Sequence, residues 1–198
     1  GVARRVAELE RLGAAVTVVA ADVAVGCEGA ALLARLAPEA AEGWPAGGSR
    51  AAEGSPAGSP EAAGRLPALG AVFHLAGVLD DGLVEGQTAA RIAAVLAPKV
   101  EGARHLDALT EGLDLSHFVL FSSAVGTLGG PGQASYAAAN AWLDALAVDR
   151  RRRGLSGQSL AWGLWTPQGQ GMTAHLGPAE LARARRAGME GLTPEAGL

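Results

Sequence analysis

The chain has 198 residues, of which 49% are hydrophobic and 18% charged, and its formal net charge is −4. A chain of this length can bury a core as a single domain, and its weakly acidic charge predicts no nucleic-acid partner and no attraction to an anionic membrane. No apolar run is long enough to cross a bilayer, and the single cysteine, Cys27, excludes an internal disulfide and indicates a reducing, cytoplasmic location.

Hydrophobic patterns along the chain alternate between β-strands and α-helices. Apolar and β-branched runs predict parallel strands, and apolar residues at helical spacing predict the helices between them. The predicted strands are 15–20, 71–75, 118–122 and 159–161, and the predicted helices are 2–12, 29–36, 88–97 with a continuation over 99–109, 136–153 and 178–187. This alternation predicts an α/β fold with a Rossmann-like, doubly wound parallel sheet.

Two features predict that residues 1–198 form one partial domain of a longer polypeptide. The chain lacks an initiator methionine and opens inside a predicted helix, and Thr193 and Pro194 start another helix just before the last residue. No strand leads through a Gly-rich, phosphate-binding turn into a helix, because the glycines of 126–132 lack the required spacing. We therefore expect the first βα units of the sheet to lie upstream of residue 1.

The segment 38–67 interrupts the α/β pattern. It contains five of the 10 prolines and six of the 29 glycines, and it shows no apolar periodicity. Such a composition is typical of flexible chain rather than of a packed element. We predict a Gly/Pro/Ser-rich surface insertion within the domain.

The stretch 118–140 holds the main candidate functional residues. A buried strand delivers Ser123 to its carboxyl end, a glycine-rich bend turns the chain back, and a helix opens near Tyr136. Tyr136 and Asn140 are four residues apart and therefore share one helix face. A hydroxyl, a phenol and an amide thus converge at the carboxyl edge of the sheet, where open α/β folds bind ligands.

Lys99 is the only lysine, whereas the other fifteen of the 16 basic residues are arginines. A lysine that survives in so arginine-rich a chain suggests that a compact ammonium is needed there, with chance survival as the alternative. A cation and a helix N-terminus near Tyr136 are expected to lower the pKa of its phenol. Such a phenol could protonate an alkoxide near neutral pH.

The other two polar groups fit the same chemistry. Ser123 could hydrogen-bond the oxygen that Tyr136 protonates, and Asn140 could hold a water that returns the proton. This set suits reduction of a carbonyl by a nicotinamide hydride. Serine hydrolysis fits poorly, because Ser123 lacks the Gly-x-Ser-x-Gly turn of a hydrolase nucleophile.

Several polar residues near strand ends have two interpretations. Asp22 could contact an adenine or cap the next helix, and the sequence favours neither. His74 is more often a packed side chain than a catalyst at such a position, whereas Gly77 would let a cofactor approach the backbone closely. The arginines of 150–153 are typical of a solvated helix end.

Five stretches of the chain carry a family resemblance. They are 74–82, 97–100, 118–123, 131–133 together with 136–140, and 159–165. In these stretches the chain resembles the ketoreductase domains of modular type I polyketide synthases, within the short-chain dehydrogenase/reductase superfamily. Most of that superfamily carries Tyr-x-x-x-Lys, whereas these ketoreductases exchange the Lys and Asn positions, which places the lysine at Lys99.

The resemblance implies that NADPH reduces a β-ketoacyl chain on the phosphopantetheine arm of an acyl carrier protein, with the other domains of the synthase as further partners. It implies that Tyr136 donates the proton and Ser123 positions the β-keto oxygen. Lys99 would perturb Tyr136, and Asn140 would complete the proton relay. The implied cofactor site comprises Asp22, Val23, Ala76, Gly77, Lys99, Tyr136, Trp162, Gly163 and Leu164. Met172 falls in the implied lid over the substrate, and no metal is implied.

The resemblance also implies a product configuration. B-type members of the family carry Leu-Asp-Asp, seen here as Leu79, Asp80 and Asp81. A-type members carry a tryptophan eight residues before the tyrosine, and that position is Leu128 here. We therefore predict a B-type, (3R)-hydroxyl product. The alternative for Asp80 and Asp81 is a plain solvated turn.

The glycine motif and the 2′-phosphate arginine of the family have no counterpart within residues 1–198. The preference for NADPH therefore comes from the resemblance alone. Because a glycine turn at a helix N-terminus anchors the pyrophosphate, we expect these 198 residues in isolation to bind cofactor weakly and to show no turnover. A catalytically silent scaffold domain and a free-standing short-chain dehydrogenase are the alternative functions.

Overall fold

The computed structural model describes residues 2–36, 68–166, 177–186 and 188–197. The predicted insertion at 38–67 and the predicted lid residue Met172 lie outside these ranges. Within the ranges, none of the helices combines the length and the apolarity that crossing a bilayer requires. The same residues contain no group of three or more His, Cys, Asp or Glu side chains that could hold a metal ion.

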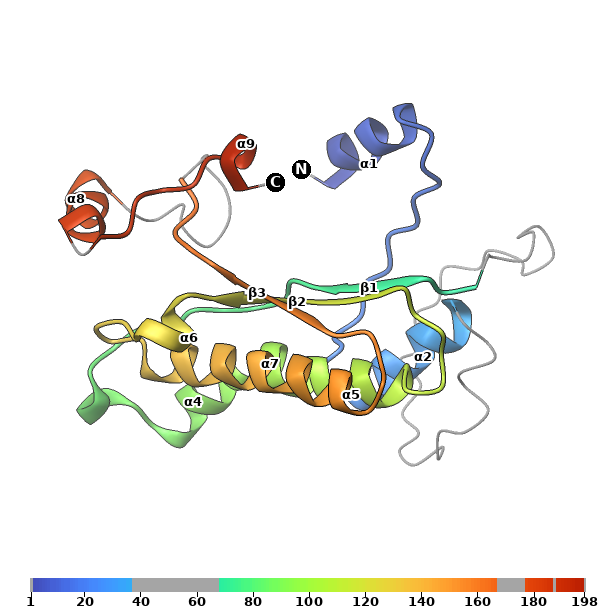
Figure 1. The fold of residues 1–198 in the computed structure, drawn as a ribbon, viewed down its shortest axis with the longest axis horizontal. Helices are drawn as coiled ribbons and strands as arrows, with labels where there is room; N and C mark the ends of the chain where they lie inside the picture. Colours follow the sequence, from blue (N-terminus) through green and yellow to red (C-terminus); the bar gives the residue numbers. More distant parts are fainter. Residues whose placement is uncertain (1, 37–67, 167–176, 187, 198) are drawn as a thin grey trace.

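A parallel sheet of three strands forms the centre of the described fold (Figure 1). The strands are β1 (Ala71–His74), β2 (His117–Ser123) and β3 (Gln158–Trp162), in that spatial order. Ala71 lies opposite His117, and Ser123 lies opposite Trp162. The sheet and its connecting helices confirm the predicted Rossmann-like α/β fold. Because the strands are parallel, their carboxyl ends share one edge of the sheet.

Helices connect the strands and cover one face of the sheet. The helical elements are α1 (Val2–Arg11), α2 (Gly26–Leu36), the 3-10 turn η2 (Val84–Gly86), α4 (Ala89–Leu96), the π-helix η3 (Ala97–Glu101), α5 (Gly102–Leu109), α6 (Val125–Leu128), α7 (Ala134–Arg152), α8 (Pro178–Arg186) and α9 (Pro194–Gly197). Figure 1 shows α2, α4, α5 and α7 along one face, whereas α1, α8 and α9 lie away from it. Thr88 starts α4 as predicted, because its Oγ1 accepts the Arg91 N–H at 3.3 Å.

The core lies between β2 and the helices α5 and α7. Phe118 and Leu120 alternate along β2 and are 1% and 0% exposed. The cluster that packs with them consists of Ala103, Leu106, Leu115, Leu143, Leu146 and Ala147. Val119 and Phe121 alternate with them and face the other way, where the ring centroids of Phe121 and Trp162 lie 6.0 Å apart. On this face Phe73 of β1 is 60% exposed, whereas its neighbour Val119 on β2 is 4% exposed.

The predicted strand at 15–20 is wrong. These residues pair with no strand of the described sheet, and Val18 is 63% exposed. A strand forms only where a neighbouring strand offers backbone donors and acceptors in register, and β1 pairs with β2 alone among the described strands. The β-branched run therefore has a strand propensity, but the described residues offer it no partner strand. Helix α2 likewise begins at Gly26 rather than at residue 29.

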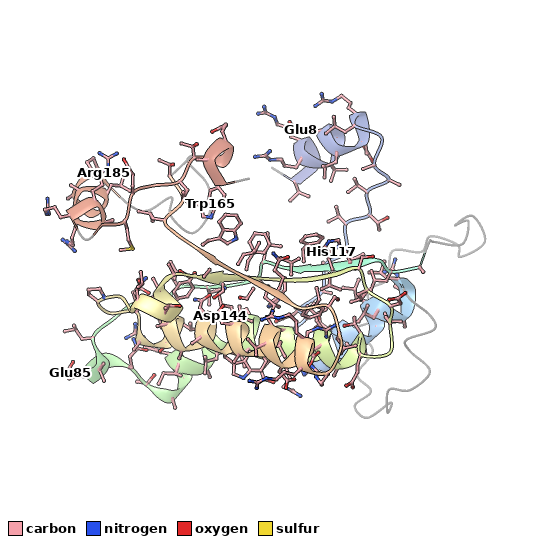
Figure 2. All side chains as sticks on the ribbon, viewed as in Figure 1. Glu8, Glu85, His117, Asp144, Trp165 and Arg185 are labelled. Atoms are coloured by element: carbon pink, nitrogen blue, oxygen red, sulfur yellow. The ribbon has the colours of Figure 1, made fainter. Side chains whose placement is uncertain are left out.

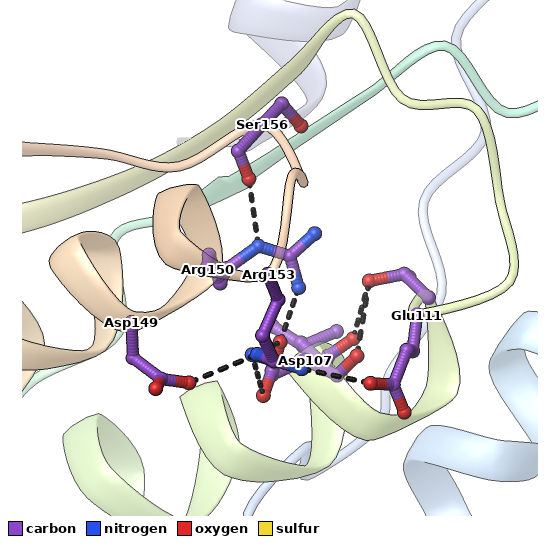
Figure 3. A network of polar contacts seen from close by, with 8 residues as sticks. Asp107, Glu111, Asp149, Arg150, Arg153 and Ser156 are labelled. Atoms are coloured by element: carbon purple, nitrogen blue, oxygen red, sulfur yellow. Dashed lines mark hydrogen bonds and ion pairs between the residues drawn. The ribbon is translucent and has the colours of Figure 1, made fainter.

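A buried arginine joins the carboxyl ends of α5 and α7 (Figure 3). The Arg150 side chain is 1% exposed, donates from Nε to the Ser156 carbonyl at 2.7 Å and pairs with Asp107. Its guanidinium carbon lies 3.8 Å from the centroid of the Phe118 ring. Arg153 also binds Asp107, with Nη2 to Oδ1 at 2.8 Å. The interpretation of 150–153 as a solvated helix end is therefore wrong for Arg150, which bridges the helix layer and the core.

We expect Arg150→Ala to lower the free energy of unfolding by about 3 kcal/mol, because truncation removes a buried side chain that packs on Phe118 and binds the Ser156 carbonyl and Asp107. Urea denaturation of the two proteins measures the difference. Arg152→Ala is the matched control, since Arg152 is an exposed residue of the same turn, and we expect a change within about 0.5 kcal/mol. Equal, small losses in the two variants would contradict a structural role for Arg150.

Candidate active site

Four polar side chains meet at the carboxyl edge of the sheet. Ser123 closes β2, Tyr136 lies in the first turn of α7 and Asn140 follows one turn later. Lys99 comes from η3, and its Nζ lies 5.5 Å from the centroid of the Tyr136 ring. The side chains of Ser123 and Asn140 both interact with Tyr136. The tertiary structure thus brings together the four residues that the sequence singled out.

A π-helical turn places Lys99 inside the protein. Pro98 has no N–H to donate within the helix, and the chain passes through the wider turn η3 at this point; such π-turns are frequent at functional sites. Lys99 is 3% exposed, and its Nζ donates to the Phe121 carbonyl at 2.8 Å. Burial lowers the pKa of Lys99 to about 8, against the opposing charge of Asp144, which Figure 2 labels on α7. The ammonium therefore loses its proton near pH 8.

The end of β1 forms the wall against which Lys99 packs. A Cβ at Gly77 would lie 2.9 Å from the Lys99 Cε, inside normal contact distance. His74 is 3% exposed, and its Nε2 lies 3.2 Å from the Lys99 carbonyl oxygen. Burial lowers the pKa of His74, which favours a neutral, packed imidazole. The sequence suggested a glycine at position 77 because a cofactor could then approach the backbone closely. The structure adds a second reason, because the Lys99 stem occupies the space that a Cβ at this position would need.

Tyr136 differs from expectation, because its pKa is raised rather than lowered. Burial of the phenol is the largest cause, and the negative charge of Asp81 acts in the same direction. Hydrogen bonding by Asn140 and Ser123 opposes both. The Lys99 ammonium lies near the ring but donates to the Phe121 carbonyl. The expected lowering is therefore wrong, since desolvation of the phenolate outweighs the favourable neighbours.

Asn140 connects α7 to the sheet and retains an unused acceptor. Its Nδ2 donates to the Tyr136 carbonyl at 2.7 Å, and its own carbonyl accepts from the Ser122 hydroxyl at 3.2 Å. Its side-chain Oδ1 is buried and has no hydrogen-bond partner among the described residues. A buried acceptor of this kind costs free energy until a donor reaches it, so the site offers a position for a bound hydrogen-bond donor.

Apart from Lys99 and Tyr136, the candidate cofactor residues separate into two groups. Ala76 and Gly77 follow β1, and Trp162 ends β3 before Gly163 and Leu164, so these five residues share the carboxyl edge with Ser123. The buried Trp162 Nε1 also lacks a hydrogen-bond partner within the described ranges.

The second group lies before α2. The Asp22 Oδ1 accepts the Ala24 N–H at 2.9 Å, which supports the capping interpretation of this residue. The Val23 carbonyl lies 3.0 Å from the His105 Nδ1 on α5. Val23 therefore packs on the helix layer, while the exposed Asp22 keeps one carboxylate oxygen without a partner in the described structure.

The Leu79-Asp80-Asp81 segment is not a plain solvated turn. Both carboxylate oxygens of Asp80 accept hydrogen bonds from Arg91, and the Asp81 Oδ2 accepts one from Gln133. Leu79 is half-buried. Leu128 ends α6 and is 76% exposed. The sequence did not indicate that Arg91 and Gln133 bind these aspartates. They lie 11 and 52 residues from the aspartates that they bind, and no local pattern links them.

Comparison with known proteins identifies the family to which this chain belongs. The family model "KR domain" matches residues 58–167. The spectinabilin polyketide synthase system protein NorB of Streptomyces orinoci is 56% identical over 130 residues, covering 66% of this chain and 6% of NorB. Polyketide synthase GfsA of Streptomyces halstedii is 47% identical over 189 residues, covering 96% of this chain and 2% of GfsA.

A solved structure gives the same result. A structure described as A-type ketoreductases from a modular polyketide synthase is 40% identical, with a TM-score of 0.76, and the match covers 98% of this chain and 34% of that chain. The chain belongs to the KR domain family of modular type I polyketide synthases. It spans about a third of the length of that solved relative and a small part of the synthases it matches.

We expect Gly77→Ala to raise the pKa of Lys99 from about 8 toward the ordinary value of about 10.4. The added methyl would meet the Lys99 Cε at 2.9 Å and displace the ammonium toward solvent. Because Lys99 is the only lysine, a protein labelled with ¹³C-lysine gives one Cε resonance, and its pH titration reports this pKa directly.

Gly70→Ala is the matched control for this titration, because a Cβ there meets no atom within 4 Å. We expect its lysine resonance to titrate as in the unsubstituted protein. The same titration midpoint in both alanine variants would show that Gly77 does not hold Lys99 in place.

Proposed function

We propose that this chain forms the catalytic part of a ketoreductase that reduces a β-ketoacyl thioester to the 3-hydroxyacyl product with NADPH. The observation that carries the proposal is the buried Lys99 ammonium beside Tyr136, with Ser123 and Asn140 at the same sheet edge. The KR family match supports it. The proposed partners are an acyl carrier protein, which would present the substrate on its phosphopantetheine arm, and the other domains of a cytoplasmic synthase.

The proposed chemistry assigns the proton to Tyr136. A raised pKa keeps its phenol protonated at neutral pH, and the protonated form is the one that can donate. The Ser123 Oγ accepts the Val125 N–H at 3.3 Å, and its one hydroxyl proton, which interacts with Tyr136 in this structure, would turn to the substrate's keto oxygen. As hydride reaches the β-carbon, the phenol proton passes to the oxygen, so that a ketone, a hydride and a proton yield an alcohol.

Lys99 and Asn140 would restore the proton on Tyr136. Lys99 is charged below about pH 8 and supplies a positive potential beside the phenol. The Asn140 Oδ1 is a buried acceptor with no partner in the described structure, which suits a water or an ammonium donor. The two side chains thus supply the charge and the acceptor that a proton relay to solvent requires.

The residues at the sheet edge fit a nicotinamide cofactor, which supplies the hydride when bound. Ala76 and Gly77 lack bulk after β1, and Trp162 at the end of β3 offers a buried indole N–H that has no partner among the described residues. Small residues at a strand end allow close approach to the backbone. Asp22 and Val23 would hold the adenosine end, and the choice of NADPH over NADH rests on the family resemblance.

The proposed product is the (3R)-alcohol of a B-type ketoreductase. Its support is local, namely Leu79-Asp80-Asp81 and the presence of Leu128 at the position of the A-type tryptophan. Overall similarity does not separate the types, since a solved relative at 40% identity is described as A-type. Chiral chromatography of the product against (3R) and (3S) standards tests the assignment, and a (3S) product would overturn it.

We expect Tyr136→Phe to reduce the rate of NADPH oxidation with a β-ketoacyl thioester by about 10³-fold, because the proton donor is removed. The assay uses the polyketide synthase polypeptide that carries this sequence. An unchanged melting temperature serves as the folding control. If the hydroxyl pattern of the synthase product is the same with Tyr136→Phe, the domain is a silent scaffold and the proposal fails.

We expect the reduction rate to fall as pH rises through about 8. Below this pH the Lys99 ammonium is charged, and above it the positive charge 5.5 Å from the centroid of the Tyr136 ring is lost. Because the pKa of Tyr136 is raised, the phenol itself stays protonated in this window. A steady-state pH profile at saturating substrate measures the effect, and a rate that is flat between about pH 7 and 9.5 would contradict it.

A further inference from the structure

Arg91 holds the segment that carries Leu79-Asp80-Asp81. It lies in the first turn of α4, and its Nε and Nη2 donate to the two carboxylate oxygens of Asp80 at 2.7 and 2.5 Å. The same guanidinium donates to the Asp81 carbonyl at 3.2 Å and to the Gly86 carbonyl at 2.8 Å. One side chain therefore fixes both the start and the end of the loop 80–86. A planar fork is required for this set of bonds, and a lysine ammonium could not make it.

The held loop is attached in turn to the first turn of α7. The Asp81 Oδ2 accepts from the Gln133 Nε2 at 2.9 Å, and the Gly82 N–H donates to the Gly132 carbonyl at 2.8 Å. A second connection runs through Gln87, whose Oε1 accepts from the Ser135 hydroxyl at 3.2 Å. Ser135 immediately precedes Tyr136. The Arg91 contacts are thus continuous with the backbone that positions the proposed proton donor.

We propose that Arg91 is a positioning residue that holds the loop 79–82 against the first turn of α7 and so selects the face of the β-keto carbon that receives the hydride. Both oxygens of Asp80 are engaged by Arg91, so Asp80 acts through the loop rather than by contact with the substrate. This inference rests on the proposed function, because it concerns the configuration of that reaction's product.

The first measurement is how well ordered the loop 79–87 is, and it does not require catalytic turnover. We expect amide hydrogen exchange in residues 79–87 to become at least about tenfold faster in Arg91→Met and in Arg91→Lys, measured in the polyketide synthase polypeptide that carries this sequence. Arg104→Met is the matched control, because Arg104 pairs with Glu101 at the exposed surface of the adjoining helix. Exchange in Arg91→Met within about twofold of the unsubstituted protein would overturn the inference.

Product configuration is the second readout. We expect Arg91→Met to raise the fraction of the minor C3 epimer about tenfold while the domain still reduces its substrate. Asp80→Asn should give a similar rise, and the double variant should exceed neither single variant, since the two side chains form one unit. Arg104→Met should leave the epimer ratio unchanged.

The two proposals fail in different ways. An unsubstituted domain that does not reduce β-ketoacyl thioesters overturns the proposed function. Normal reduction with the same epimer ratio in Arg91→Met overturns the inference about Arg91 alone. Additive effects of Arg91→Met and Asp80→Asn would likewise contradict a role for Arg91 that acts through Asp80.

Discussion

The burial of one ammonium constrains the whole site. An ammonium that is only 3% exposed needs hydrogen-bond acceptors inside the protein. Lys99 donates to one of them, the Phe121 carbonyl of β2. That bond is possible only because the π-turn η3 directs the lysine inward and Gly77 leaves room for its stem. The lowered pKa of Lys99 follows from the same burial. The position, the charge and the chemistry of this residue are therefore consequences of one packing arrangement.

Helix α7 carries the site at one end and a structural anchor at the other. Tyr136 lies in its first turn, whereas Arg150 near its last turn is buried against Phe118 and pairs with Asp107. Between them, Leu143 is fully buried in the core. A helix fixed at both ends and along its length would hold the proposed proton donor within a narrow range of positions, as precise geometry requires.

The Leu79-Asp80-Asp81 segment contacts both the start of this helix and α4. Its two carboxylates are occupied by Arg91 and Gln133, so the segment acts as a connection between α4 and α7. Charge-assisted, bidentate bonds of this kind fix orientation as well as distance. The charged groups of this short motif are therefore turned toward protein partners.

The sequence by itself determined the parallel strands, the cap at Thr88, the shared helix face of Tyr136 and Asn140, and the family, because each depends on neighbours within a few residues or on a run of adjacent side chains. Only the tertiary structure decided that 15–20 pairs with no strand among the described residues, that Arg150 is buried, and that Arg91 binds Asp80 eleven residues away. It also reversed the expected pKa shift of Tyr136. Desolvation and pairing between distant segments depend on what the folded chain brings alongside a residue, and no local pattern records that.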